Sequence, residues 1–204
     1  VEMNGTLGTL TIGPTGSIRA VAGFGGTGYV GTSHSFGGTM TLVNQGLISA
    51  EASCRTLYVQ PGSWTNAGTV QATGGTLAIS GSVGVNGANR LATSSIGTIT
   101  ITVNLLGDVA NPTLYTPQGT LTLNGAGTAA APQLLEVMGR DRGLEAAGFT
   151  HNFAYGTLSL GSSTYVKLVD QAANTTSGEP EALYVNSLIV PSSATLNLNG
   201  LHVY

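Results

Sequence analysis

The chain has 204 residues, a length that fits one domain or one large all-β unit. Charged residues make up 7% of it, against about 25% in ordinary globular proteins, while hydrophobic residues make up 41%. The net charge of −3 and the scattered arginines exclude the clustered basic surface that binds nucleic acid. No stretch of about 18 residues is continuously apolar, so we expect no membrane insertion.

A short phrase recurs along the chain: a glycine or other small residue, then threonine, then alternating apolar and small polar residues. Such alternation over four to six residues predicts a β-strand with one apolar face and one polar face. The phrase occurs as GTLTIG from Gly8, GTMTLV from Gly38, GTLAIS from Gly75, GTITITV from Gly97, GTLTLNG from Gly119, GTLSLG from Gly156 and ATLNLNG from Ala194.

The spacing of these phrases predicts the fold. Thr76, Thr98 and Thr120 follow at intervals of 22 residues, and the Asn-x-Gly phrases at Asn44 and Asn66 repeat at the same interval. A period of about 20 to 22 residues holding two or three short strands is typical of a β-solenoid. We therefore predict an all-β fold, a single-stranded right-handed parallel β-helix (β-solenoid) with about 20–22 residues per coil. The whole chain, residues 1–204, would form one continuous β-helix of roughly nine coils.

The corners between strands are expected at glycine and asparagine, because both residues tolerate positive φ. In Asn-x-Gly, the asparagine side chain can bond its own backbone or stack on the asparagine of the next coil. Cys54 is the single cysteine, which excludes a disulfide framework within the chain. Its apolar-patterned surroundings predict a buried small hydrophobe.

The second half of the chain is less regular. The stretch from Pro132 to Gly148 is the one candidate helix, but its internal glycines favour a strand over QLLEVM followed by an excursion loop. The polar segment 171–181 is expected to be an exposed loop insertion. We accordingly divide the β-helix into generic solenoid coils at 1–130 and a distinct C-terminal module at 131–204.

The C-terminal module contains the passages LEVMGRDRG from Leu135, AAGFTHNFAYGTLSLGSSTYVKLVD from Ala146 and EALYVNSLIVPSSATLNLNGLHVY from Glu181. These passages resemble a module near the C-termini of large secreted bacterial β-helix proteins, the autotransporter-adhesin-like and filamentous-haemagglutinin-like repeat proteins found in planctomycetes. Residues 1–130 share only the general phrasing of that family. The resemblance implies a right-handed parallel β-helix on or outside the cell, and further chain would be expected after LNGLHVY.

The titratable residues suggest no catalytic or metal-binding group. Glycoside hydrolysis needs two carboxylates about 5–10 Å apart, and no acidic residue recurs at the coil period. Glu136 in a predicted strand, and Glu179 and Glu181 in a loop, are interpreted as solvated surface charges. Asp141, between two arginines, is interpreted as part of a local ion pair. The histidines lack the spacing of metal ligands. We predict no catalytic, cofactor-binding or metal-ligating residues, no cofactor and no enzyme activity.

Function is therefore expected to come from shape. We predict a non-enzymatic structural or adhesive β-solenoid, secreted or at the cell surface. It would assemble end to end as a homo-oligomeric filament, or form part of a longer surface passenger. An uncapped coil exposes unpaired backbone groups, and the sequence offers no amphipathic capping helix. The alternating last strand predicts an assembly end at Leu201, Val203 and Tyr204, with His202 pointing outward.

Two other functions stay open on sequence grounds. Trp64 and Tyr58 are candidate sugar-stacking residues, which would make the chain a carbohydrate-binding or polysaccharide-cleaving β-helix with a cell-surface glycan as partner. Alternatively, Thr98, Thr100 and Thr102 form a Thr-x-Thr-x-Thr row, and Thr120 and Thr122 would lie one coil above Thr100 and Thr102. A flat threonine array of this kind can order water and bind ice, although threonine is also a favoured polar residue of exposed strands.

Overall fold

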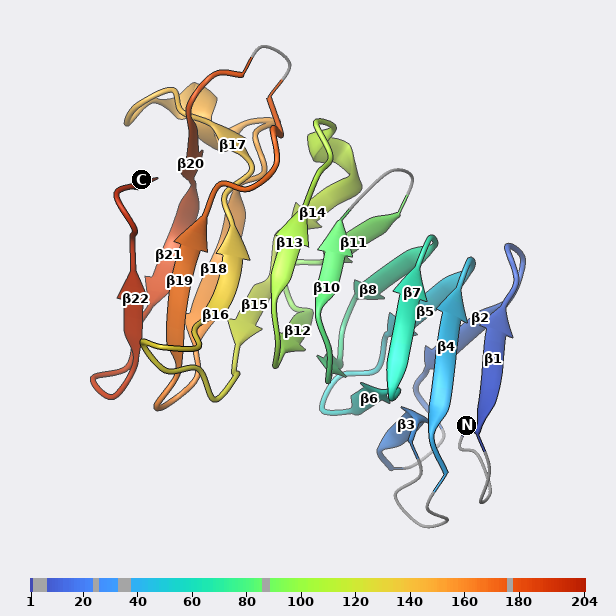
Figure 1. Ribbon diagram of the computed structural model, residues 1–204. Helices are drawn as coiled ribbons and strands as arrows, with labels where there is room; N and C mark the ends of the chain where they lie inside the picture. The colour runs from blue at the N-terminus through green and yellow to red at the C-terminus, as the bar shows by residue number, and fades with distance from the viewer. Residues whose placement is uncertain (2–6, 24–25, 33–37, 86–88, 176–177) are drawn as a thin grey trace.

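The fold is an all-β, single-stranded parallel β-solenoid, which confirms the fold class predicted from the repeats (Figure 1). The computed structural model describes residue 1 and residues 7–23, 26–32, 38–85, 89–175 and 178–204. Strands pair with the strand three positions later in the chain, so a regular coil contributes three strands to three different sheets. One pairing, between β17 and β20, is antiparallel, and the other pairings among the described residues are parallel.

Five sheets result. The longest contains β3 (Gly28–Gly31), β6 (Thr56–Gln60), β9 (Thr76–Ile79), β12 (Thr98–Ile101), β15 (Thr120–Leu123), β18 (Tyr155–Leu160) and β21 (Val185–Ile189). The second contains β2 (Ser17–Ala20), β5 (Leu47–Ala50), β8 (Thr69–Ala72), β11 (Arg90–Thr93) and β14 (Tyr115–Pro117). The third contains β10 (Val83–Val85), β13 (Leu105–Gly107), β16 (Gln133–Glu136), β19 (Tyr165–Val169) and β22 (Thr195–Asn197).

Two small sheets lie nearer the ends of the chain. One contains β1 (Gly8–Ile12), β4 (Met40–Asn44) and β7 (Ser63–Asn66), and the other contains β17 (Gly139–Arg140), β20 (Glu181–Leu183) and β23 (His202–Val203). The helical elements are two short 3₁₀ turns, η1 (Pro112–Leu114) and η2 (Ala146–Phe149). Over the described ranges, no helix has the length and apolarity needed to cross a membrane.

The strand register confirms the 22-residue coil where the sequence is regular. Thr76 pairs with Thr98, and Thr98 pairs with Thr120. Side chains alternate along a strand, so the residue after each threonine points into the core. The resulting column of stacked, buried apolar side chains is Leu57, Leu77, Ile99, Leu121 and Leu158.

The longest sheet has seven strands, so the prediction of roughly nine coils was wrong. At about 4.8 Å per strand the sheet extends about 29 Å along the solenoid axis. The difference arises from excursions that leave the coil and return without adding a strand to this sheet. Thr120 pairs directly with Thr157, and Thr157 with Ser187, although the sequence between each pair is longer than one regular coil.

The corners use asparagine as predicted. Asn44 is fully buried, and its Nδ2 donates to Oδ1 of Asn66 in the next coil at 2.7 Å. Its Oδ1 accepts a hydrogen bond from the backbone N–H of Gly46 at 3.2 Å. Asn44 therefore connects its own corner to the adjacent coil. Asn199 and Gly200, between β22 and β23, both have positive φ, 52° and 80°, as expected in general for asparagine and glycine at corners.

The repeated corner glycines act differently from the prediction. Gly46 and Gly68 are not among the residues with positive φ. A Cβ atom on Gly68 would lie 2.2 Å from the carbonyl oxygen of Gly46, and one on Gly46 would lie 2.2 Å from that of Gly16. Glycine is needed there because the backbones of successive coils approach closely. Cys54 also differs from the prediction, because it is exposed in a turn with φ of 56° instead of buried.

Candidate functional sites

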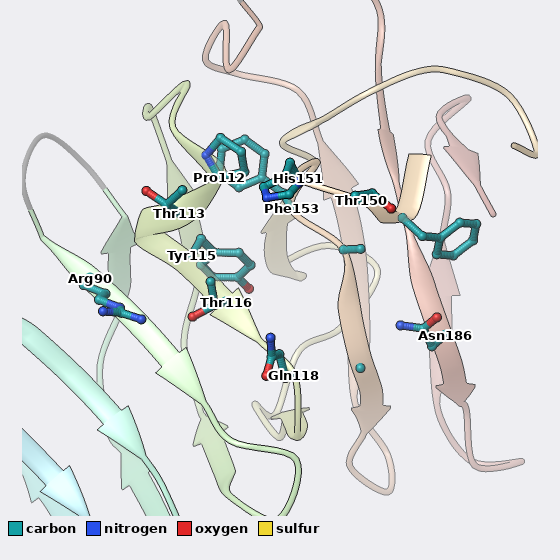
Figure 2. Close-up of a pocket in the computed structure, with 13 residues that line it drawn as sticks. Arg90, Pro112, Thr113, Tyr115, Thr116, Gln118, Thr150, His151, Phe153 and Asn186 are labelled. Atoms are coloured by element: carbon teal, nitrogen blue, oxygen red, sulfur yellow. The ribbon is translucent and has the colours of Figure 1, made fainter. Parts of the chain in front are cut away.

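A groove of about 550 Å³ lies on the side of the solenoid where the sheet of β14 stops (Figure 2). In the following coil, the chain carries η2 and the segment 150–154 where another strand would continue that sheet. The interrupted stacking leaves a hollow between β14 and this segment. The lining runs across four successive coils, from Arg90 on β11 to Asn186 on β21.

Buried aromatic rings lie beneath the groove. The ring of Tyr115 on β14 lies 5.5 Å from the ring of Tyr155 in an edge-on arrangement and 6.2 Å from the ring of Phe153. All three side chains are buried. Burial raises the pKa of both tyrosine hydroxyls above the ordinary value, so both stay neutral at physiological pH. These rings provide a rigid apolar base.

One wall of the groove is fixed by the buried side chain of Asn152. Its Oδ1 accepts from the backbone N–H of Arg140 at 2.8 Å, and its Nδ2 donates to the carbonyls of Arg140 and Gly148 at 2.9 and 3.0 Å. The residues on either side, His151 and Phe153, have φ of 51° and 57°. Such backbone costs about 1–3 kcal/mol per residue and persists only where the surroundings enforce it. Asn152 thereby places Phe153 inward and His151 at the exposed rim.

The rim of the groove is polar and carries two basic side chains. Arg90, Gln118 and His151 are exposed around it, and three threonine hydroxyls, those of Thr113, Thr116 and Thr150, also line it. Asn186 donates from Nδ2 to the carbonyl of Tyr155 at 3.0 Å, which leaves its side-chain oxygen as an acceptor. The described residues that line the groove include no carboxylate. The surface is thus rich in hydroxyl and amide groups with a local positive charge.

The predicted sugar-stacking residues lie outside this groove and on different sheets. Tyr58 on β6 stacks on Tyr29 of β3, with ring centroids 5.2 Å apart and planes at 11°. Trp64 on β7 is half-buried, and its Nε1 donates to the carbonyl of Ser82 at 2.9 Å. The structure therefore does not bring Trp64 and Tyr58 together, and each side chain joins neighbouring coils.

The predicted assembly-end residues lie in the final coil. Val203 on β23 pairs with Leu183, and Leu201 and Val203 are half-buried against the core. The ring of Tyr204 stacks on the buried Tyr184 ring, with centroids 5.1 Å apart. The apolar side chains most exposed in this coil are others, namely Leu188 (38%), Ile189 (49%), Val190 (41%) and Leu198 (43%).

Glu136 is buried, which corrects its interpretation as a solvated surface charge. Its Oε1 accepts from the backbone N–H groups of Gln171 and Ala172 at 2.6 and 3.0 Å. Burial raises the pKa of Glu136, and these hydrogen bonds only partly oppose that rise. The carboxyl therefore holds the beginning of the segment 171–181.

Glu181 is also buried and belongs to β20 instead of a loop. Its Oε1 accepts from the backbone N–H of Asn174, and the Asn174 side chain is itself buried. Burial, with a smaller contribution from the nearby negative charges of Asp170 and Glu136, raises the pKa of Glu181 to about 7. The segment 171–181, expected to be an exposed insertion, is thus tied to the core by two carboxyls.

Asp141 pairs with His202 and not with the flanking arginines. Its Oδ2 lies 2.6 Å from Nδ1 of His202, which is exposed as predicted, and the Tyr204 hydroxyl lies 3.2 Å from the same nitrogen. Arg140 pairs instead with Glu179. Burial raises the pKa of Asp141, but hydrogen bonds from a backbone N–H, His202 and Tyr204 together outweigh that rise, so the net pKa is below its ordinary value. Within the described residues, no three His, Cys, Asp or Glu side chains are grouped to hold a metal ion.

The outward threonines are more regular than their sequence spacing suggests. Excursions leave the coil between strands and do not change the register of the strands themselves. Thr98 and Thr100 on β12, and not Thr100 and Thr102 as predicted, pair with Thr120 and Thr122 on β15. Thr157 and Ser159 on β18 follow in the same register. The complete ladder on this sheet is Thr56, Thr76, Thr98, Thr120, Thr157 and Ser187.

Comparison of the chain with protein-family models, with curated proteins and with solved structures finds no match in any of the three. The class of protein is therefore given by the fold alone. The chain is a parallel β-solenoid whose first part is regular and whose second part contains excursions.

Proposed function

We propose that this chain is a non-enzymatic structural β-solenoid of a secreted or cell-surface protein, and that its final coil stacks end to end on a second copy. The observation that carries the proposal is the apolar surface of that coil. Leu158 on β18 is fully buried, whereas its register partner Leu188 on β21 is 38% exposed. The same inward position is therefore covered in one coil and accessible in the next.

Stacking would give hydrogen-bond partners to the backbone groups of this surface and would bury its apolar side chains. β21 and β22 lie at the edges of their sheets, and edge strands are templates for pairing with another strand. Complete burial of an aliphatic side chain contributes about 1.5–3 kcal/mol. Covering the half-exposed side chains of Leu188, Val190 and Leu198 would thus contribute on the order of 3 kcal/mol. Solenoids obtain their stability from such contacts between neighbouring repeats.

Two further observations support the proposal. The C-terminal module resembles that of secreted bacterial adhesin-like β-helix proteins, which favours a location outside the cell. The ionisable side chains with defined contacts stabilise the fold: Arg19 holds Glu51 through two hydrogen bonds of 2.7 Å, and the buried glutamates hold backbone amides. These contacts favour a structural role over a catalytic one.

Sedimentation velocity over a range of protein concentrations tests end-to-end stacking. The unmodified chain is expected to associate as concentration rises, and Leu188→Lys is expected to abolish association because it places a charge on the stacking surface. Thr100→Lys, on the lateral face of β12, is the matched control and should associate normally. Val190→Lys provides a second test, should Leu188→Lys not fold, because Val190 lies two residues after Leu188, on the same face of the strand, and is 41% exposed. A monomer at every concentration, or undiminished association of the end-coil variants, would contradict the proposal.

A further inference from the structure

We propose that the groove beside β14 binds an acidic oligosaccharide, a sugar chain that carries carboxylate or sulfate groups. This inference does not depend on end-to-end stacking, because the groove lies along the side of the solenoid (Figure 2). Four features of the groove lead to it: its length, the chemistry of its edge strand, its hydroxyl and amide lining, and its charge.

The groove has the dimensions of a site for an extended ligand. It crosses four coils, so at about 4.8 Å per coil it extends about 14 Å along the axis. Its volume of about 550 Å³ falls in the usual range for small-molecule sites. A chain of several sugar rings fits this length and can continue past either end, because the groove is open.

The edge of β14 is poorly suited to a peptide. A peptide strand that adds to a sheet edge needs free N–H and C=O groups along it. β14 has three residues and ends in Pro117, which has no N–H to donate. The N–H of Tyr115 is already bonded to the carbonyl of Pro112. Recognition in this groove must therefore come from side chains.

The side chains of the groove have the hydrogen-bonding properties that sugar hydroxyls require. The hydroxyls of Thr113 and Thr150 already donate to Asn111 Oδ1 and to the carbonyl of Ala146, so they offer acceptors to a ligand. Thr116 and Gln118 offer a hydroxyl and an amide that can both donate and accept. Beside them lies the half-buried ring of Phe149, which offers an apolar face to the C–H groups of a sugar ring. The combination of an apolar ring with adjacent hydroxyls and amides suits a carbohydrate.

The charge of the groove selects an acidic ligand. Arg90, from β11, and His151, from the segment 150–154, are both exposed in the lining (Figure 2). Neither forms an ion pair with another residue of the described chain. The guanidinium group binds carboxylate and sulfate oxygens through two parallel hydrogen bonds. The described lining contains no carboxylate that would repel the carboxylate or sulfate groups of the ligand, although the chain as a whole has a net charge of −3.

Isothermal titration calorimetry with three hexasaccharides tests the proposal: a galacturonic acid hexamer, a heparin-derived hexamer and neutral cellohexaose. At least one acidic hexamer is expected to bind at least tenfold more tightly than cellohexaose, with affinity falling as salt increases. Preference between the two acidic probes identifies carboxylate or sulfate as the recognised group. Equal binding of all three, or no binding of either acidic hexamer at millimolar concentration, would overturn the proposal.

Variants locate the binding to the groove. Arg90→Ala is expected to weaken binding of the preferred acidic hexamer at least fivefold, while Arg55→Ala, another exposed arginine outside the groove, is the control and should bind normally. His151→Asn removes the imidazole and retains a residue type that tolerates positive φ, so the wall should keep its shape. It is expected to weaken binding of the preferred acidic hexamer, because it removes the imidazole from the rim of the groove. Equal effects of Arg90→Ala and Arg55→Ala would place any binding elsewhere.

Discussion

The regular coils between β4 and β15 and the excursion-bearing half after β15 maintain the same strand register by different means. In the regular coils, residues of the same type stack in successive coils, as Asn44 does on Asn66 and Thr76 on Thr98. After β15, single buried side chains anchor each excursion, as Asn152 does for the chain between Arg140 and Gly148. Repeated residues in the first part and single anchoring side chains in the second part thus keep the strands of successive coils in the same register.

Tyr184 illustrates individual anchoring. It is fully buried, its hydroxyl accepts from the backbone N–H of Arg142 at 2.7 Å and donates to the carbonyl of Gly143 at 3.0 Å. The Phe149 ring packs edge-on against it at 5.2 Å. One side chain thus contacts both the beginning of the excursion between β17 and β18 and its η2 turn. The comparison shows that a solenoid can carry long excursions without losing register, provided that each is anchored to the core.

The largest loss of stability is expected from Gly97→Ala, because the regular coils approach closely at this glycine. A Cβ atom at Gly97 would lie 2.0 Å from the carbonyl oxygen of Ala72, so two coils must separate. We expect a loss of about 4 kcal/mol in the free energy of unfolding, measured by urea denaturation. Gly13→Ala is the control, because nothing lies within 4 Å of its Cβ position, and it should change stability by less than about 0.5 kcal/mol. Similar losses for the two variants would refute close approach as the reason for the corner glycines.

Removal of an individual anchor should be less costly and confined to its excursion. Asn152→Ala leaves one N–H and two carbonyls without their partner, for an expected loss of about 3 kcal/mol. Hydrogen exchange should accelerate between Arg140 and Phe153, while the strands of the regular coils stay protected. Asn111→Ala is the control, since Asn111 is exposed and bonds only the nearby Thr113, and it should cost about 1 kcal/mol or less. Loss of protection across the regular coils would show that the anchor stabilises the whole solenoid.

The regular half could be predicted from the sequence because repetition is visible in it. The intervals from Thr76 to Thr98 and Thr120 give the coil length directly, and the Asn-x-Gly phrase gives the corner hydrogen bonds. The reason for the corner glycines could not be predicted in this way. A glycine required by close approach of two backbones and a glycine required by positive φ look the same in the sequence. The number of coils was overestimated for a related reason, since excursion residues resemble coil residues in composition.

The candidate groove could not be predicted, because its residues have no repeat relation to one another. Arg90 and Asn186 face the same hollow only because the strand that would cover it is replaced by η2. The available signal was the gap in the strand phrase between Gly119 and Gly156, which contains the aromatic pair Phe149 and Phe153. The buried glutamates were missed because a single acidic residue at a strand end is, by itself, indistinguishable from a surface charge.

The smallest expected effect concerns pH and distinguishes a buried anchor from a surface ion pair. Burial raises the pKa of Glu181 to about 7 from an ordinary value of 4.5, so the folded chain binds this proton more tightly than the unfolded chain. Its contribution to stability is therefore complete below about pH 4.5 and is lost as the pH rises through about 7. Glu51 has the opposite sign, because its hydrogen bond to Arg19 lowers its pKa, and its contribution is lost as the pH falls.

The test is the difference in unfolding free energy between pH 4.5 and pH 7.5. Glu181 Oε2 and Asn174 Oδ1 are buried acceptors without a partner, so a proton on Glu181, or the amide of a Glu181→Gln variant, supplies a donor that this region lacks. We expect the original chain to lose on the order of 1–2 kcal/mol more stability over this interval than Glu181→Gln does. Glu51→Gln, the control, should not reduce that loss. Identical pH profiles for Glu181→Gln and the original chain would mean that Glu181 is ionised in the folded state as it is in the unfolded chain, and that burial does not raise its pKa.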